Sequence, residues 1–321
     1  MGSLAGAVAR EGGMGVISTA CIGFREPDFL KNPCEAGKRA LKKEIEKARK
    51  IAEGRGMIAV NVMVATTDFE EMVKSACEAG IDAIISGAGL PLTLPKLTEG
   101  KDVLLAPIVS GKKACSMLKR VWKRHNDRTP DFFVCESSLA GGHLGFSEED
   151  ALNDTVEDSI RELKEVIEEA GDIPVFSAGG VFDSKDIKER LELGAYGVQI
   201  GTRFIATEEC DATDGFKKVI TDSEDEDVFV LKSPVGMPGR GLRTPLMDKV
   251  ADGSRIPPER CIGCIKTCNP ATTPYCISRA LIQAYYGNAE EGLFFGGSNT
   301  GRINKIVTVK ELINELSEGW K

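Results

Sequence analysis

Three short segments in the middle of the chain place glycines beside groups that could do chemistry. Gly141-Gly142-His143, Gly179-Gly180 and Gly201-Thr202 each follow a short apolar run. Imidazole moves protons near neutral pH, and flanking glycines leave room for a flat ring beside it. Glycine also lets backbone N–H groups approach an anion closely. The pattern predicts a proton-handling group at His143 and a phosphate site at the other two segments.

Each of these segments also has a simpler interpretation. A glycine pair after a strand is often only a tight turn, and a lone histidine is more often structural than catalytic. Two glycine sites at the ends of successive strands favour phosphate binding, and the glycine-rich loop around His143 favours chemistry. His125, the second of the two histidines, lies in the polar stretch RHNDR and is expected to be exposed.

A cluster of cysteines near the C-terminus follows the spacing C-x₂-C-x₃-C-x₇-C. Its members are Cys261, Cys264, Cys268 and Cys276. Four thiolates in one short loop suit an iron–sulfur cluster or a tetrahedral zinc ion, and the alternative is four buried free thiols. The spacing favours metal, with iron–sulfur ahead of zinc. The other six cysteines are scattered, as is typical of reduced intracellular thiols.

The elements that must position these groups are strands and helices that alternate along the chain. Continuous apolar runs are typical of strands buried on both faces of a parallel sheet, and the charged segments between them have helical periodicity. The apolar runs lie at 15–19, 57–64, 82–87, 103–110, 132–137, 174–180 and 197–204. The amphipathic segments lie at 35–52, 68–79, 155–170 and 183–193. This alternation predicts an α/β fold, and specifically a (β/α)₈ TIM barrel.

A barrel of this type needs eight strands, and its phosphate sites commonly follow strands seven and eight. The two glycine segments that end the runs at 174–180 and 197–204 suit those positions. A helix-like segment at 4–13 precedes the first visible run, so the barrel's first strand is expected before residue 1. We therefore expect the chain to be truncated, and a form extended upstream by roughly 20 residues to be more stable.

The alternation stops after residue 204, and the next segment has a different character. An acidic stretch at 222–227, a loop at 233–243 and the cysteine cluster follow. We expect residues 1–209 and 291–321 to form the barrel and residues 210–290 to form a smaller C-terminal insertion domain. A helix after Thr308 is expected to close the barrel.

Composition narrows the class of protein. The apolar fraction of 42% and the charged fraction of 28% are ordinary for a globular chain, and no apolar run is long enough to span a membrane. The net charge of −8 disfavours nucleic acid as a partner. Because the N-terminus has no basic segment before its apolar run, we expect a cytoplasmic protein.

Three motifs together resemble those of a known family. AGGHLG at 140–145, SAGG at 177–180 and QIGTRF at 199–204 are similar in order and spacing to the flavin-binding motifs of the nitronate monooxygenase and enoyl-acyl-carrier-protein reductase II family. The nitronate monooxygenases were once called 2-nitropropane dioxygenases. The resemblance covers most of residues 3–204, with weaker similarity in GRGLR at 239–243 and in the FFGGSNTGRI stretch.

The resemblance implies a role for individual residues. His143 matches the catalytic histidine of the family. The residues that match its FMN-contacting positions are Asn61, Gly141, Gly142, Gly179, Gly180, Gln199, Ile200, Gly201 and Thr202. Glu136 stands where many nitronate monooxygenases have a glutamine that contacts FMN. An ionised carboxylate cannot donate the amide's hydrogen bond, so Glu136 puts that contact and the substrate class in question.

The resemblance also implies the reaction. We expect one FMN, and not FAD, because the chain has no GxGxxG fingerprint. The favoured activity is nitronate monooxygenase, which oxidises alkyl nitronates with dioxygen. The alternatives are an NAD(P)H-dependent enoyl thioester reductase and a quinone reductase. The partners expected are thus a small-molecule substrate, NAD(P)H in the reductase case, and a second copy of the chain if the protein is a homodimer.

Two interpretations lie outside this class of enzyme. A phosphate-binding barrel isomerase or aldolase would share the glycines, but it would normally need a lysine or carboxylate at a strand end, and Glu136 is the best candidate. A degenerate barrel that only binds a ligand is the second. Absorbance of a bound flavin would separate both from the oxidoreductase.

Overall fold

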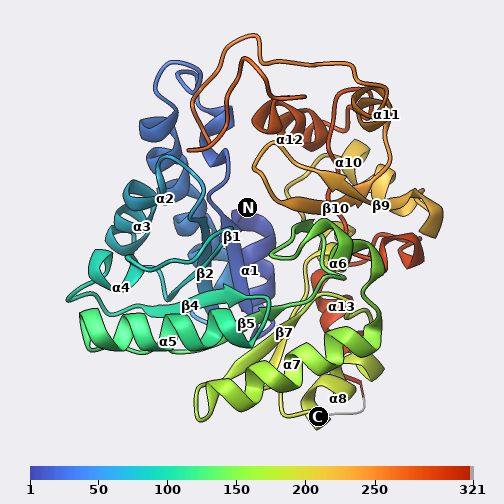
Figure 1. Cartoon of the computed structure of the whole chain (residues 1–321). Helices are drawn as coiled ribbons and strands as arrows, with labels where there is room; N and C mark the ends of the chain where they lie inside the picture. Colours follow the sequence, from blue (N-terminus) through green and yellow to red (C-terminus); the bar gives the residue numbers. More distant parts are fainter. Residues whose placement is uncertain (319–321) are drawn as a thin grey trace.

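The computed structural model describes residues 1–318 and shows a curved parallel sheet with helices packed around it (Figure 1). Seven strands form this sheet, in the spatial order β1-β2-β3-β4-β5-β7-β8. They are β1 (Met14–Ser18), β2 (Met57–Met63), β3 (Ala83–Gly87), β4 (Leu104–Val109), β5 (Phe133–Glu136), β7 (Val175–Ala178) and β8 (Gly197–Gln199). Each predicted apolar run overlaps one of these strands. The prediction of an α/β fold with a parallel sheet is therefore confirmed.

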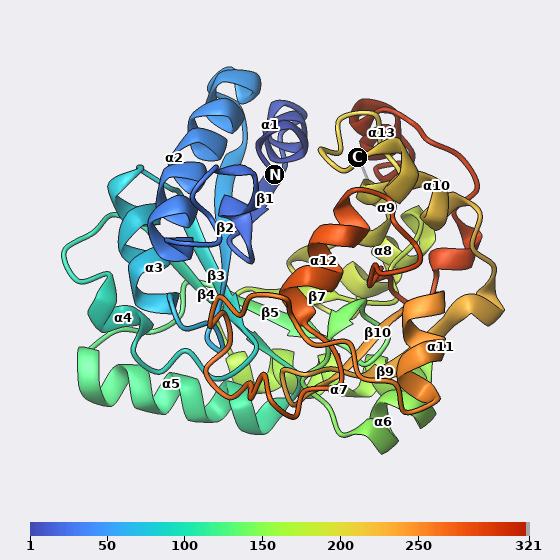
Figure 2. The ribbon, with the colours of Figure 1, turned by 90° about the horizontal axis from the view of Figure 1, so that it is seen from above.

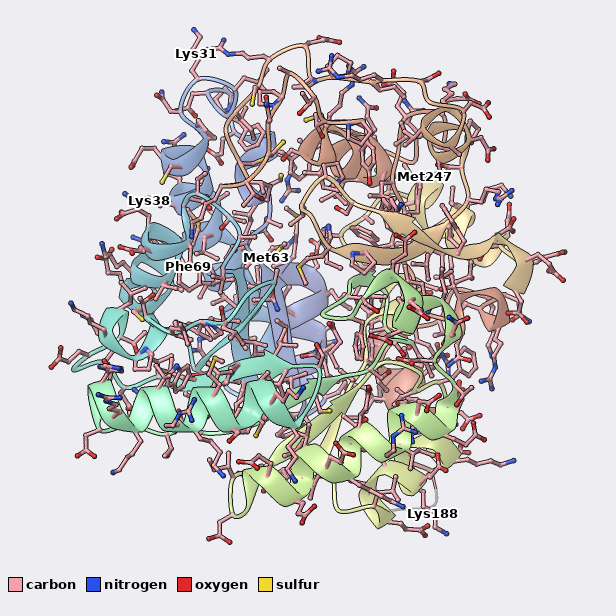
Figure 3. All side chains as sticks on the ribbon, viewed as in Figure 1. Lys31, Lys38, Met63, Phe69, Lys188 and Met247 are labelled. Carbon is pink, nitrogen blue, oxygen red and sulfur yellow. The ribbon has the colours of Figure 1, made fainter. Side chains whose placement is uncertain are left out.

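Amphipathic helices cover the outer face of the sheet and carry exposed charges such as Lys188 of α8 (Ser184–Glu192) outward (Figure 3). The helices along this face are α2 (Pro33–Ala52), α3 (Phe69–Glu78), α4 (Leu94–Leu97), α5 (Lys112–Asn126), α7 (Val156–Ala170) and α8 (Ser184–Glu192). Capping boxes at Thr155 and Asp183 fix where α7 and α8 begin. The four predicted amphipathic segments correspond to α2, α3, α7 and α8.

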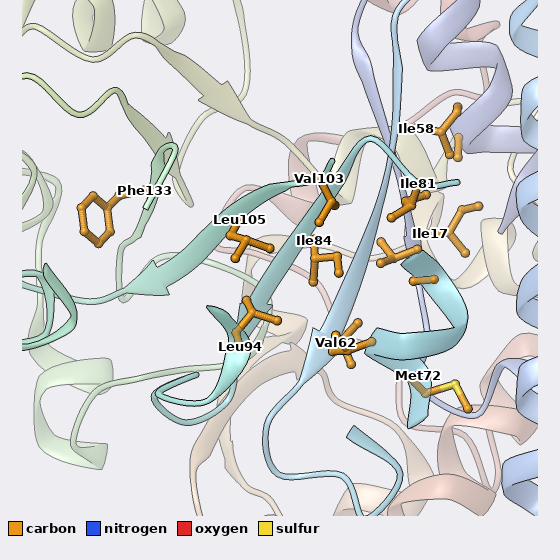
Figure 4. Close-up of a cluster of buried hydrophobic side chains, with 14 of the residues drawn as sticks. Ile17, Ile58, Val62, Met72, Ile81, Ile84, Leu94, Val103, Leu105 and Phe133 are labelled. Carbon is orange, nitrogen blue, oxygen red and sulfur yellow. The ribbon is translucent and has the colours of Figure 1, made fainter. Parts of the chain in front are cut away.

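Both faces of the sheet are buried, as continuous apolar strands require. Along β2, Ile58 and Val62 point outward into the large cluster between sheet and helices, part of which Figure 4 shows. Ala59, between them, belongs to a second cluster on the inner face, together with Ala83 and Ala106. Small side chains on the concave face leave room for the backbone of neighbouring strands to curl.

The curved sheet is open between β1 and β8, its two outermost strands. Helix α1 (Gly2–Arg10) lies beside this gap and packs against α2 and the C-terminal helix α13 (Val309–Leu316) (Figure 2). The buried carboxylate of Asp211 accepts hydrogen bonds from the backbone N–H groups of Ser3 and Leu4, and so anchors α1 to the β8 side. Among residues 1–318 the parallel sheet has seven strands.

A small antiparallel sheet stands above the carboxyl ends of the parallel strands. It has the order β6-β10-β9, with β6 (Gly142–His143), β9 (Val228–Lys232) and β10 (Pro238–Leu242). The prediction of a loop over 233–243 is wrong in its second half, because β10 pairs with both β9 and β6. The remaining elements are η1 (Ile22–Arg25), α6 (Glu148–Asn153), α9 (Thr202–Ile205), α10 (Asp214–Thr221), η2 (Asp225–Asp227), α11 (Pro245–Ala251), α12 (Ile277–Tyr285) and η3 (Thr300–Arg302).

The segment after β8 has a hydrophobic cluster of its own, which includes Leu231, Leu246 and Tyr275. Its backbone is also tied to the parallel sheet. Lys266 donates its backbone N–H to the Ala65 carbonyl oxygen at 3.0 Å, just beyond the end of β2. Because β6 comes from the loop after β5, the small sheet joins residues on both sides of the predicted domain boundary. Helix α13 begins at its predicted cap, Thr308, and packs through Leu312 against Ile187 of α8.

Candidate active site

A cavity opens at the carboxyl ends of β5, β7 and β8, the end at which parallel α/β sheets bind ligands. Its volume is about 290 Å³. Four backbone segments line most of it, namely 139–142, 178–182, 199–203 and 295–299. The first three carry the glycine motifs singled out in the sequence, and the fourth comes from the far end of the chain.

Two glycines with left-handed backbone conformations form the floor of this cavity. Gly179 and Gly180 directly follow β7, with φ of +88° and +70°. A Cβ atom at Gly179 would lie 2.6 Å from the Ser137 side-chain oxygen and 2.8 Å from the Ala140 backbone nitrogen. Glycine is therefore required there both by conformation and by space. The turn exposes successive backbone N–H groups, which is the arrangement that binds anions such as phosphate.

The N-terminus of the next helix, α8, contributes little to an anion site. Asp183 caps α8 and accepts the backbone N–H groups of Lys185 and Asp186 at 3.0 and 3.2 Å. These donors of the first turn are already satisfied, and the cap carries a negative charge. The glycine turn, rather than the helix N-terminus, therefore supplies the free N–H groups.

Two arginines stack on the aromatic ring that borders this end of the cavity. The guanidinium groups of Arg203 and Arg302 lie 4.4 and 3.9 Å from the ring centroid of Phe182. Arg203 also makes a bidentate contact with Glu315 at 2.7 and 3.2 Å, and this contact lowers the pKa of Glu315. The Glu315 carboxylate offsets part of the positive charge. The arginines therefore contribute more to the shape of the cavity wall than to the electrostatic potential in the cavity.

His143 lies beside the cavity rather than in its lining. The Nε2 atom of its ring is 2.7 Å from Ser233 Oγ, and Phe295 packs edge-on against the ring with centroids 5.0 Å apart. Burial lowers the pKa of His143 to about 4, because the charged form would lose its hydration. The imidazole is therefore neutral at physiological pH, and it can hydrogen-bond to an anionic substrate without bringing a net charge.

Glu136 ends β5 and lines the cavity, and its environment changes the protonation state expected of its carboxyl group. Burial raises the pKa of Glu136 to about 8, and a hydrogen bond from the backbone N–H of Gly145 only partly offsets this. The carboxyl group is therefore mostly protonated at pH 7. A protonated carboxyl donates one hydrogen bond, as the amide of a glutamine does.

This raised pKa predicts how stability depends on pH. The folded protein holds a proton on Glu136 that the unfolded chain releases near its ordinary pKa of 4.5, so this contribution to stability is lost as pH rises toward about 8. We expect Glu136→Gln to gain stability relative to the wild type between about pH 5 and about pH 8. Urea unfolding at both pH values measures this difference, with the exposed Glu168→Gln as a control. If the unfolding free energies of wild type and Glu136→Gln changed in parallel between these pH values, Glu136 would be ionised in the folded protein across this range.

The structure brings most of the predicted cofactor residues together. Glu136, Gly141, Gly142, Gly179, Gly180, Gln199, Ile200, Gly201 and Thr202 all line the one cavity. Asn61 does not. It lies in β2, where its carbonyl oxygen accepts hydrogen bonds from the backbone N–H and the hydroxyl of Thr19 at 3.0 and 3.1 Å.

The fourth lining segment, 295–299, was only weakly indicated by the sequence. The backbone N–H of Gly297 donates to Thr202 Oγ1 at 3.0 Å, and that of Ser298 donates to the Leu139 carbonyl at 3.0 Å. A Cβ at Gly141 would lie 2.5 Å from the Gly296 carbonyl carbon, so the two glycine loops pass in direct contact. The glycine pair in FFGGSN was the available signal, because glycines far apart in sequence often mark close backbone approach.

The prediction of a metal centre at the cysteine cluster is not supported. The four cysteines surround a small cavity of about 30 Å³, but within residues 1–318 no three His, Cys, Asp or Glu side chains converge as metal ligands would. Cys264 Sγ accepts a hydrogen bond from the Ser278 hydroxyl at 2.9 Å, and burial raises the pKa of Cys264 and Cys276. Metals bind thiolates, and burial favours the neutral thiol.

None of the helices in the described part of the chain combines the length and apolar character needed to cross a bilayer.

Comparisons with known proteins agree on one family. The family model described as nitronate monooxygenase matches residues 1–319. A probable nitronate monooxygenase of Staphylococcus saprophyticus is 27% identical over 59% of this chain and 51% of its own length. The chain thus matches about half the length of this relative. A Mycobacterium tuberculosis protein named (3aS,4S,5R,7aS)-5-hydroxy-7a-methyl-1-oxo-octahydro-1H-indene-4-carboxyl-CoA dehydrogenase is 24% identical over 98% of this chain and 87% of its own length.

Solved structures share the fold. FabK from Thermotoga maritima has a TM-score of 0.76 and 25% identity, and the match covers 98% of this chain and 86% of FabK. A nitroalkane oxidase from Streptomyces ansochromogenes has a TM-score of 0.71 and 19% identity, over 98% of this chain and 90% of the oxidase.

Proposed function

The chain belongs to the nitronate monooxygenase family, and from this premise we propose that it is an FMN-dependent oxidoreductase that oxidises alkyl nitronates with dioxygen. The observation that carries the proposal is the cavity in which the three glycine motifs meet at the ends of β5, β7 and β8. The predicted catalytic side chain, His143, lies at its border, one residue from the lining glycine Gly142.

The residues present fit a flavin mononucleotide better than a larger cofactor. The turn at Gly179 and Gly180 offers one cradle of backbone N–H groups, and a Cβ at Gly179 would collide with Ser137 and Ala140 of the loop after β5. One cradle suits the one phosphate of FMN. Glu136 and Gly142 line the same cavity farther along the β5 loop, where they would border the ring system. Bound FMN would supply the electron-accepting chemistry that no side chain of the chain provides.

The protein's own groups would bind and orient the substrate. We propose that the N–H groups of Gly179 and Gly180 hold the phosphate, and that the protonated carboxyl of Glu136 donates a hydrogen bond to the flavin. The neutral ring of His143 would donate a hydrogen bond to an oxygen of the anionic nitronate. Because His143 is uncharged at pH 7, this hydrogen bond stabilises the anion without a fixed ion pair that would hold the product.

A second candidate function is the reduction of an enoyl thioester with NAD(P)H. It is favoured by the dehydrogenase from Mycobacterium tuberculosis, which is named for a carboxyl-CoA substrate and whose match covers nearly the whole chain. In this case the same His143 N–H would stabilise the enolate oxygen of the thioester. The two candidates share the cavity and differ in the electron donor.

We also propose a finer description of the fold. The seven-stranded curved sheet would be a (β/α)₈ barrel in which the gap between β1 and β8 is the position of the remaining strand. Residues 210–290 would form a smaller domain that covers the carboxyl ends of the strands. The separate cluster around Leu231 and Tyr275 supports this division.

We expect the purified protein to bind one FMN and to be reduced by a nitronate under anaerobic conditions. The test follows bleaching of flavin absorbance with a nitronate, NADH and NADPH in parallel samples. Bleaching by the nitronate supports the first candidate, and bleaching by NAD(P)H alone would replace it with the second. A colourless protein that takes up no added FMN would reject both.

A further inference from the structure

The hydrogen bond between His143 and Ser233 is built into the small sheet above the cavity. Strand β10 pairs with β6 so that Gly239 stands opposite His143, and the backbone N–H of Leu144 donates to the Pro238 carbonyl at 2.8 Å. Strand β9 pairs with β10 so that Lys232 stands opposite Pro238. Ser233, the next residue, is therefore placed beside the imidazole by backbone register rather than by side-chain flexibility.

The turn that follows β9 holds Ser233 in place. The backbone N–H of Ser233 donates to the Met237 carbonyl at 3.3 Å, and that of Gly236 donates to the Ser233 carbonyl at 3.0 Å. Ser233 is buried, with only 9% of the residue exposed to solvent. Its Oγ accepts the backbone N–H of Val235 at 3.3 Å. One lone pair of the hydroxyl is thus occupied. The hydroxyl also contacts Tyr275, whose own O–H donates to the Lys232 carbonyl at 3.5 Å, so Nε2 of His143 at 2.7 Å is the nearer acceptor for the Ser233 proton.

The ring of His143 is confined on its other side as well. Phe295 packs edge-on against it, and a bridge between Gly241 and Phe295 fixes the backbone of that residue. A Cβ at Gly239 would lie 3.2 Å from the Phe295 ring, so glycine at this position lets the ring approach the small sheet. The imidazole therefore has little freedom to rotate away from Ser233.

We propose that Ser233 is a positioning residue that donates its hydroxyl proton to Nε2 of His143 and so fixes the ring as the Nδ1–H tautomer. The separation of 2.7 Å between Ser233 Oγ and Nε2 is normal for an O–H donor. Neutral imidazole has one donor and one acceptor nitrogen, and the bond made by one of them decides the role of the other. The proton at Nδ1 is then the ring's one remaining donor, which an anionic oxygen of the substrate requires.

This inference rests on the proposed function for its kinetic consequence, but its structural part can be tested alone. The chain has two histidines, so selective ¹⁵N labelling of histidine gives a spectrum with two rings, and the exposed His125 serves as an internal reference. In the wild type we expect His143 to show a protonated Nδ1 and an unprotonated Nε2. In Ser233→Ala we expect the two shifts to move toward each other, as the tautomers mix.

Kinetics and two further variants complete the test. We expect Ser233→Ala to lower turnover about tenfold, on the scale of one hydrogen bond, with little change in KM. Ser233→Thr keeps the hydroxyl and should restore the wild-type shifts. The matched control is Ser223→Ala, which removes another buried hydroxyl, one that donates to the Ile220 carbonyl at 2.8 Å, and it should change neither the shifts nor turnover.

The outcomes separate the inference from the proposed function. Unchanged His143 shifts in Ser233→Ala, or a protonated Nε2 in the wild type, would overturn the positioning role even if the enzyme oxidises nitronates. The expected shifts in a protein that does not react with nitronates would leave the positioning role intact and reject the proposed function.

Discussion

Replacing His143 with alanine should leave FMN bound and lower turnover by a factor on the order of 10² or more. The cavity explains the first part, because its lining includes Gly142 and Phe295 but not the imidazole. The second part follows from the loss of the neutral ring that Ser233 holds at the border of the cavity. Flavin absorbance and steady-state turnover with a nitronate measure the two effects separately.

The control for this substitution is His125→Ala, which removes the exposed histidine near the end of α5 and should leave turnover unchanged. Wild-type turnover in His143→Ala would remove the imidazole from the mechanism. Loss of flavin from His143→Ala with an intact fold would instead assign the ring to cofactor binding.

The parallel strands were predictable because a strand that is buried on both faces consists of a continuous run of mostly apolar residues. In β3, Ala83–Gly87, every residue is buried, and its one polar side chain, Ser86, donates its hydroxyl to the Val62 carbonyl oxygen. The helices between strands were predictable from one apolar face and from caps such as Thr155, which bonds to the backbone three residues on. Both signals are contained within about twenty residues of sequence.

The small antiparallel sheet could not be predicted in this way. Strand β6 has two residues, and its partner β10 lies nearly a hundred positions away in sequence. The glycines in β10 suggested a loop, yet Gly241 lies in the strand. Glycine is needed there because a Cβ would lie 2.5 Å from the Phe294 carbonyl oxygen. Glycine here permits close packing between segments, a requirement that no local window of sequence contains.

The candidate site likewise contains residues that were predictable from the order of elements and residues that depend on long-range pairing. Gly179, Gly180 and the residues 199–202 follow their own strands, so their place at one edge of the sheet follows from the order of elements alone. Ser233 and Phe295 reach His143 only through the pairing of β10 with its neighbours. Sequence similarity indicated His143, but its hydrogen-bond partner required the structure.

The cysteine cluster shows the opposite case, in which a local pattern predicted a metal centre that the arrangement of the described residues does not support. Spacing in sequence cannot show whether thiols converge on one point or pack separately. Cys264 and Cys268 are instead packed against the hydrophobic cluster of the 210–290 segment. Apolar surroundings favour the neutral thiol, which is a poor ligand.

Gly179→Ala should both destabilise the fold and abolish FMN binding. The new methyl group would lie 2.8 Å from the Ala140 backbone nitrogen and 2.6 Å from Ser137 Oγ, and φ at this position is +88°. The backbone of the β5 loop cannot move without disturbing Gly141 and Gly142, which line the same cavity. Overpacking and the left-handed conformation together should cost about 2–4 kcal/mol of unfolding free energy.

The matched control is Gly171→Ala, at the turn that precedes the same strand, β7. Gly171 has a φ of +68°, but a Cβ there would meet nothing within 4 Å. With ψ of −121°, Gly171 has a backbone conformation that side chains other than glycine rarely adopt. This variant carries a conformational cost without a clash, so we expect a loss of about 1–3 kcal/mol and unchanged FMN affinity. Urea unfolding and fluorescence titration with FMN measure both quantities for both variants. If Gly179→Ala bound FMN as tightly as Gly171→Ala, the turn after β7 would not be the phosphate cradle, and the phosphate would have to be held by the N–H groups after β8, where Gly201 faces open space.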